Sequence, residues 1–240
     1  MRSEPIRIPE HGNTKIIAHR GASVLECENT AAAFIAAGNR SYWGMETDIF
    51  RTIDRQFMCH HDESTGRICE KDLAIEKSTY DELRALRLKD LDGKSDRAEL
   101  CLCAPWEYRK ICEKYAKVCV PELVSKFIPD EMERLIGIFE GYLENTVFIA
   151  FDMANLDLVR RFRPEQTVQF LSGWWTDDLP AMLEERKMDL DIEWNSLTED
   201  RVKACHERGI RVNCWTVDDP AKAEELISWG VDYITSNALE

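Results

Sequence analysis

The chain has little positive charge for its size. Lys and Arg account for 31 of its 240 residues, against 45 Asp and Glu, and the net charge is −14 at pH 7. Such a surface repels the phosphates of nucleic acids and of anionic membranes, so no nucleic-acid partner is expected. A small anionic substrate remains compatible with this charge, because one divalent cation can reverse the sign of the potential inside a cleft.

Long apolar segments are also missing. No run approaches the roughly 18 apolar residues of a membrane-spanning helix, and residues 1–56 contain no basic stretch followed by an apolar one. The nine cysteines are scattered, and no second pair joins Cys101 and Cys103 to complete a zinc pattern. We therefore expect a cytoplasmic protein with reduced thiols and no stable membrane insertion, and we make no prediction of its oligomeric state.

No GxGxxG turn, typical of an open dinucleotide-binding sheet, follows the first predicted strand. Instead, β-rich runs alternate with helical stretches almost from end to end. The predicted strands are 15–20, 45–50, 117–122, 146–152, 167–171, 188–192, 211–217 and 232–235. The predicted helices are 29–38, 105–115, 129–143, 156–162, 178–186, 198–208 and 220–229. This alternation predicts parallel strands with crossover helices, closed into a (β/α)8 TIM barrel.

One short apolar run does not fit the alternation. Residues 56–60 follow the strand at 45–50 too closely for a crossover helix, and Asp54-Arg55 between them is typical of a turn. We expect a hairpin that returns the chain toward the barrel mouth. The weakly patterned segment at about 62–103 is interpreted as a small insertion after that hairpin, within a single domain spanning residues 1–240.

Three acidic residues stand at predicted strand ends. Glu46 and Asp48 are two apart in one strand, so their side chains leave the same face. Glu122 ends the apolar strand that begins at Lys117. The C-terminal ends of barrel strands meet at the mouth, where three carboxylates can converge on one hard cation. The alternative is a set of exposed strand ends with solvated acids.

Two histidines and an arginine occupy similar positions. His19 and Arg20 end the first predicted strand, and His61 ends the returning strand of the hairpin. Histidines on either side of a phosphodiester can serve as general base and general acid, and an arginine can bind two phosphate oxygens. His60 is the weaker candidate because strand alternation turns it from the face of His61. A structural role for either histidine is the alternative.

Trp215 ends the predicted strand that begins at Arg211. Its ring can form an aromatic wall against a glycerol or choline moiety, and packing inside the barrel is an equally good interpretation.

Together these residues resemble the glycerophosphodiester phosphodiesterase family. The resemblance runs from about residue 15 to the C-terminus and is carried by an ordered set of short motifs. These are Ala18-His19-Arg20-Gly21-Ala22-Ser23, Glu28-Asn29-Thr30, Gly44-Met45-Glu46-Thr47-Asp48, His61-Asp62, Glu122, Trp215-Thr216-Val217-Asp218 and Gly230-Val231-Asp232-Tyr233-Ile234-Thr235. Each motif alone is weakly specific, whereas the ordered set is highly specific.

The resemblance implies a barrel that binds Mg²⁺ or Ca²⁺ through Glu46, Asp48 and Glu122. It further implies that His19 and His61 are the acid–base pair and that Arg20 binds the phosphate. In the family the neighbouring glycerol hydroxyl attacks phosphorus first, through a cyclic phosphate. One departure stands out: the family's strand-end lysine is Val124 here, which removes a cation directed at the phosphate.

The resemblance therefore predicts metal-dependent hydrolysis of glycerophosphodiesters, small-molecule substrates, to glycerol 3-phosphate and an alcohol. A phospholipase D-like activity of the sphingomyelinase D kind uses the same histidines and acids, and is disfavoured by the lack of a signal peptide and of an apolar entry surface. A catalytically weakened barrel that only binds a phosphodiester is the third interpretation, and Val124 is its support.

Overall fold

The computed structural model describes residues 4–8 and 10–240. Its strands form one nine-stranded sheet, in which β1 also pairs with β2 and so closes a barrel. The parallel strands of the barrel are β1 (Lys15–Ala18), β2 (Gly44–Arg51), β4 (Val118–Leu123), β5 (Phe148–Ala150), β6 (Val168–Ser172), β7 (Asp189–Glu193), β8 (Val212–Trp215) and β9 (Tyr233–Ser236). The predicted (β/α)8 TIM barrel is confirmed.

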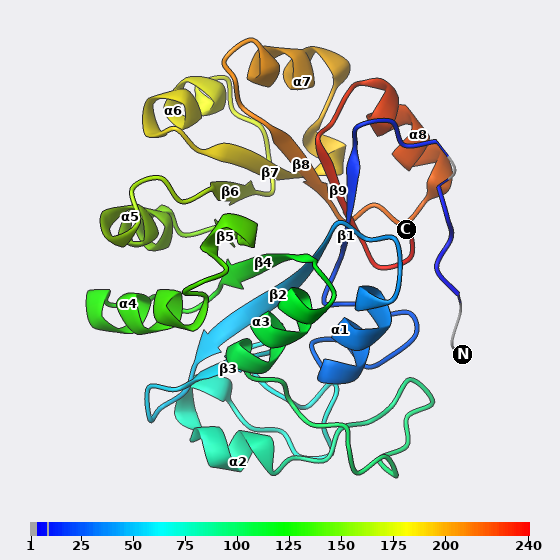
Figure 1. Ribbon diagram of the computed structural model, residues 1–240, viewed down its shortest axis with the longest axis vertical. Coiled ribbons are helices and arrows are strands. Elements are labelled where there is room, and N and C mark those ends of the chain that lie inside the picture. The colour runs from blue at the N-terminus through cyan, green and yellow to red at the C-terminus, as the bar shows by residue number, and fades with distance from the viewer. Residues whose placement is uncertain (1–3, 9) are drawn as a thin grey trace.

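Helices lie around the outside of the ring of strands (Figure 1). The helices that connect consecutive barrel strands are α1 (Ala31–Gly38), α3 (Pro105–Lys114), α4 (Pro129–Ile138), α5 (Met153–Phe162), α6 (Leu179–Arg186), α7 (Glu199–His206) and α8 (Pro220–Ser228). The 3₁₀ turns η2 (Leu143–Asn145) and η3 (Trp194–Ser196) lie in the loops. Side-chain N-caps such as Thr30, Asp152 and Asp219 start several of these helices. No described helix is long and apolar enough to cross a membrane.

The expected hairpin is present. β3 (Phe57–Cys59) pairs antiparallel with the C-terminal half of β2, in the register Ile49↔Cys59. Arg55 takes the left-handed turn position at φ 60°, where glycine is usual. Its guanidinium contacts Asp130 and Glu131 at 2.8 and 3.0 Å, which holds the turn against α4.

Tyr108 ties helix α3 to the two strands that carry the acidic residues. Its buried hydroxyl donates to the carbonyl of Met45 on β2 at 2.6 Å and accepts from the backbone N–H of Val120 on β4 at 2.7 Å. The Tyr108 ring packs against the ring of Phe34 on α1, and the two ring centroids are 4.8 Å apart. The outer core between strands and helices thereby fixes the spacing of β2 and β4.

The segment 62–103 lies beside the C-terminal half of β2 and contains η1 (Ile75–Lys77) and α2 (Tyr80–Arg84). Its apolar side chains, among them Ile75, Leu83 and Leu88, form a cluster together with Phe50 of β2 and Met58 of β3. Because this cluster is shared with the barrel, we infer that the segment is an insertion within one domain rather than a separate unit.

Candidate active site

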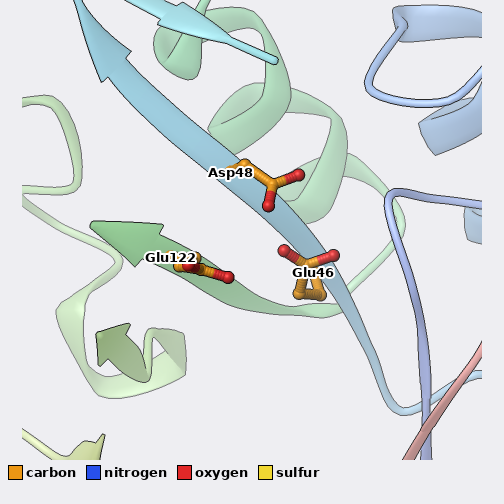
Figure 2. Close-up of side chains that lie close together, drawn as sticks. All are labelled: Glu46, Asp48 and Glu122. Atoms are coloured by element: carbon orange, nitrogen blue, oxygen red, sulfur yellow. The ribbon is translucent and has the colours of Figure 1, made fainter. Parts of the chain in front are cut away.

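Three carboxylates converge at the C-terminal end of the barrel. Glu46 and Asp48 leave one face of β2, and Glu122 leaves the adjacent β4, where it is in register with Asp48. Figure 2 shows the three side chains turned toward one another. One oxygen from each lies within 4.8 Å of the others. No other group of three or more such ligands occurs among the described residues.

Burial makes this cluster electrostatically unfavourable in the absence of a cation. Burial, and next the charge of Asp48, raise the pKa of Glu46 well above its usual range, and the same two causes raise the pKa of Glu122. Glu46 Oε1 is buried without a hydrogen-bond partner. Three hard oxygen donors around an unsatisfied buried atom fit Mg²⁺ or Ca²⁺, and they fit softer thiolate-binding metals poorly.

Short hydrogen bonds orient two of the carboxylates. The backbone N–H of Arg20 donates to Glu46 Oε2 at 2.8 Å, and the amide of Asn29 donates to Asp48 Oδ2 at 2.7 Å. The Thr47 hydroxyl donates to the Asn29 oxygen at 2.7 Å, which fixes the orientation of that amide. The sequence predicts a helix that starts at Asn29; in the structure Thr30 is the N-cap, and Asn29 is fully buried against the acidic cluster.

His19 is held by Asn237, which was not predicted from the sequence, and Asn237 is held in turn by Asp218 of the motif Trp215-Thr216-Val217-Asp218. The Asn237 amide donates to Asp218 at 2.8 Å, which leaves its Oδ1 to accept from His19 Nδ1 at 2.8 Å. His19 Nε2 is then the unprotonated nitrogen, and it lies 3.9 Å from Glu46. Burial, and next the charge of Arg20, lower the pKa of His19, so the ring is neutral near pH 7.

His61 is held differently. Its Nδ1 lies 2.6 Å from Asp62 Oδ1, and Arg67 donates to the other oxygen of Asp62 at 2.6 Å. Burial raises the pKa of Asp62, but the hydrogen bonds from Arg67 and His61 outweigh burial and lower this pKa to about 2. This carboxylate, held by Arg67, fixes the direction of the His61 ring. His60 is fully buried and bonded to the backbone of Asp62, away from the cleft.

Arg20 belongs to a chain of charges that reaches the insertion. Its Nη1 donates to Glu28 at 2.9 Å, and its Nε lies 3.7 Å from Asp48 without a hydrogen-bond partner. Glu28 also accepts two hydrogen bonds from Arg67, at 2.7 and 2.8 Å. Arg67 therefore bonds both to the partner of Arg20 and to the partner of His61.

One cleft of about 200 Å³ brings these groups together. All of the predicted site residues line it, namely His19, Arg20, Glu46, Asp48, His61, Glu122 and Trp215. The other lining residues are Ile149, Phe151, Leu171, Asp191, Thr216 and Thr235. Phe151 meets the Trp215 ring edge-on, with centroids 5.7 Å apart. Asp191 was not predicted from the sequence, where it is one of three acidic residues of β7 together with Asp189 and Glu193.

The departure at position 124 has a structural counterpart. Val124 follows the end of β4 and packs against the apolar cluster of the insertion, and it is not among the residues that line the cleft. Among the described lining residues, Arg20 is therefore the only arginine or lysine.

Comparison with known proteins agrees with this geometry. The model of the glycerophosphoryl diester phosphodiesterase family matches residues 19–240. The glycerophosphodiester phosphodiesterase of Caldanaerobacter subterraneus is 27% identical over 95% of each chain. The structure of a glycerophosphodiester phosphodiesterase from Parabacteroides distasonis has a TM-score of 0.79 at 29% identity, covering 94% of this chain and 93% of that one.

A phosphodiesterase of Oleispira antarctica, solved with the product sn-glycerol-3-phosphate, shares the fold with a TM-score of 0.83 at 22% identity, over 93% of each chain. The family predicted from the ordered motifs is thus confirmed by a family model that covers nearly the whole chain. The chain belongs to the glycerophosphoryl diester phosphodiesterase family, and it is an enzyme of the phosphodiesterase class.

Proposed function

We propose that this enzyme hydrolyses glycerophosphodiesters to glycerol 3-phosphate and an alcohol, with a divalent cation held by Glu46, Asp48 and Glu122. The observation that carries the proposal is a single cleft lined by these carboxylates, two histidines and an arginine. The product-bound relative from Oleispira antarctica supports the choice of product. A bound cation would neutralise the negative charge of the phosphate oxygens and of the carboxylates together.

His19 is the proposed general base. Because Asn237 accepts from Nδ1, the lone pair of Nε2 is free to take a proton from a glycerol hydroxyl. The lowered pKa keeps His19 unprotonated at neutral pH, as a base requires. The hydroxyl adjacent to the phosphate then attacks phosphorus and forms a cyclic phosphate.

His61 is the proposed general acid. The carboxylate of Asp62 accepts from Nδ1–H and orients the ring, so that Nε2–H can donate a proton to the leaving oxygen of the head group. Water would open the cyclic ester in a second step, with the two histidines exchanging roles. Arg20, whose Nε has no hydrogen-bond partner, would donate to a phosphate oxygen throughout.

A steady-state assay with glycerophosphocholine tests the proposal. Mg²⁺ or Ca²⁺ should support hydrolysis and a chelator should abolish it. His19→Ala and His61→Ala should each lower kcat by about 10²–10⁴-fold, the usual contribution of general acid–base catalysis, while metal affinity stays within a few fold. His206→Ala is the matched control, because His206 bonds Asp232 at 2.9 Å and does not line the cleft.

The binding-only interpretation rests on Val124 and predicts a different result. If the wild type hydrolyses no glycerophosphodiester with either metal, and both histidine variants bind glycerophosphocholine as tightly as the wild type, the catalytic assignment is wrong. A barrel that binds phosphodiesters would then replace it.

A further inference from the structure

One carboxylate of the cleft has no part in the proposed mechanism. Asp191 lies on β7, which the strand order places opposite β2 across the barrel. Its side chain lines the cleft and is 1% exposed, and its Oδ1 is buried without a hydrogen-bond partner. An unpaired buried carboxylate costs free energy, and native proteins retain such groups mainly where a ligand completes them.

A second unsatisfied polar group lies on the next strand. The indole Nε1–H of Trp215 is buried without an acceptor, and Trp215 lines the same cleft. Trp215 is in register with Glu193, so it stands two residues nearer the mouth than Asp191 on the adjacent strand. An acceptor and a donor, both without partners, therefore belong to two residues that line the same cleft.

The chemistry of this pair selects the group that would complete it. A hydroxyl both donates and accepts, so it can satisfy the carboxylate and the indole N–H together. A phosphate oxygen would satisfy the indole only, and the carboxylate form of Asp191 would repel it. An ammonium group would satisfy Asp191 only and leave the indole unpaired.

The surroundings agree with a short carbon chain that carries a hydroxyl. Leu171 of β6, in register with Asp191, and Ile149 of β5 form apolar walls of the cleft. The groups proposed to act on phosphorus lie on β2 and β4, in the loop after β1 and in the segment after β3, whereas β7 lies opposite β2. The cleft thus has a phosphate side and a hydroxyl side.

We propose that Asp191 and Trp215 form a subsite for the terminal hydroxyl of the glycerol moiety, the one not adjacent to the phosphate. Asp191 accepts from that hydroxyl and Trp215 Nε1–H donates to it. This inference rests on the proposed function and assigns Asp191 as a specificity-determining residue. An acyl chain on that hydroxyl removes its proton and adds bulk inside the barrel, so lysophospholipids should be excluded.

Two phosphate monoesters that differ only by this terminal hydroxyl provide the test. sn-Glycerol 3-phosphate and propane-1,2-diol 1-phosphate share the phosphate and the adjacent hydroxyl, but only the first has the terminal one. Calorimetric titration of the wild type with Mg²⁺ should show about 10–100-fold tighter binding of glycerol 3-phosphate, the value of a hydrogen bond to a charged group.

The variants locate the effect. Asp191→Asn, which keeps the shape of the side chain, should reduce the preference to within a few fold, and Trp215→Phe, which keeps an aromatic ring, should reduce it partly. Glu193→Gln is the matched control on the same strand; Glu193 bonds Asn195 and does not line the cleft, so the preference should be unchanged. A merely structural role for Asp191 would weaken both ligands equally.

The outcomes separate this inference from the proposed function. Equal affinity of the wild type for the two phosphates, no measurable binding of glycerol 3-phosphate, or an unchanged preference in Asp191→Asn overturns the subsite. If the preference is present and depends on Asp191 but no diester is hydrolysed, the subsite is supported and the proposed catalytic function fails.

Discussion

Position 124 carries a valine where the family has a lysine, and this valine does not line the active-site cleft. Val124 comes two residues after Glu122 and donates its backbone N–H to Ile49 at 3.1 Å, so β2 and β4 stay paired up to this point. Its side chain packs with Phe50 in the apolar cluster of the insertion and lines a neighbouring cleft. We expect a longer side chain here to follow that apolar surface and to place its end group in the active-site cleft.

We therefore expect Val124→Lys to raise kcat for glycerophosphocholine. The added ammonium would stabilise charge on the phosphate, and one such group commonly changes turnover by about 10²–10³-fold, so a gain of at least about tenfold is predicted. Val124→Met, of similar length but uncharged, is the control in the same steady-state assay. Equal kcat for the two variants would mean that Arg20 and the cation already supply the stabilisation needed.

At the scale of elements, the insertion contributes a residue that organises the site from outside. Arg67 makes hydrogen bonds to Asp62 and to Glu28, the partners of His61 and Arg20. Burial raises the pKa of Glu28, but the hydrogen bond from Arg67 and the charge of Arg20 outweigh burial and lower this pKa to about 2. One guanidinium thus holds both ionised partners in place.

Loss of this guanidinium should impair catalysis without unfolding the enzyme. We predict that Arg67→Met lowers kcat by about 10–100-fold, as is usual when a residue that orients a site is removed, with metal affinity within a few fold of the wild type. Arg67→Lys should recover part of the activity because it can still pair with one carboxylate. Arg87→Met, an exposed arginine on the same insertion, is the control, and equal kcat for the two methionine variants would contradict the assignment.

Helix α3 positions the acidic strands through a single hydroxyl. Tyr108→Phe would leave the carbonyl of Met45 and the N–H of Val120 without partners inside the core. We expect the free energy of unfolding, measured by urea denaturation, to fall by about 1–3 kcal/mol. Tyr115→Phe, at the end of the same helix, removes a hydroxyl that makes no described hydrogen bond and should change stability by less than about 0.5 kcal/mol. Similar losses in both variants would refute the bridging role.

At the scale of the whole molecule, the acidic cluster links stability to pH and to metal. Glu46 and Glu122 have folded-state pKa values well above their ordinary 4.5, mainly because of burial. At pH values between the ordinary pKa of 4.5 and the raised folded-state pKa, these two side chains are protonated in the folded state and ionised in the unfolded state, so the folded state binds more protons. The metal-free enzyme therefore loses stability as pH rises above about 5, and a cation that binds the ionised carboxylates should restore it.

Thermal denaturation at about pH 5 and pH 8, with chelator and with excess Mg²⁺ or Ca²⁺, measures this linkage. The rise in Tm on adding metal should be larger at pH 8 and reach about 5–11 °C when the cation is present at about 100 times its Kd, a stabilisation of about 2.7 kcal/mol. The double variant Glu46→Gln and Glu122→Gln should show no metal effect and a weaker pH dependence, which separates the site from the general repulsion of a chain with net charge −14. A rise in Tm of equal size at pH 5 and pH 8 would contradict the proposed linkage between the carboxylates, pH and metal.

The sequence by itself determined the barrel and the main set of candidate site residues. Strand and helix periods are local, so the alternation of elements, the hairpin without a crossover helix and the closure into eight parallel strands follow from neighbouring residues. Side chains at the C-terminal ends of parallel strands meet at one mouth, so Glu46, Asp48, Glu122 and His19 were identifiable before their distances were known.

Only the tertiary structure decided how these residues are held. Asn237 reaches His19 across 218 residues of sequence, and Arg67 reaches Glu28 across 39. Asp191 and Trp215 line the same cleft only because the register of β7 and β8 pairs Asp191 with Asn213 and Glu193 with Trp215. These contacts depend on the shear of the closed barrel and on how the insertion packs, and neither leaves a periodic signal along the chain.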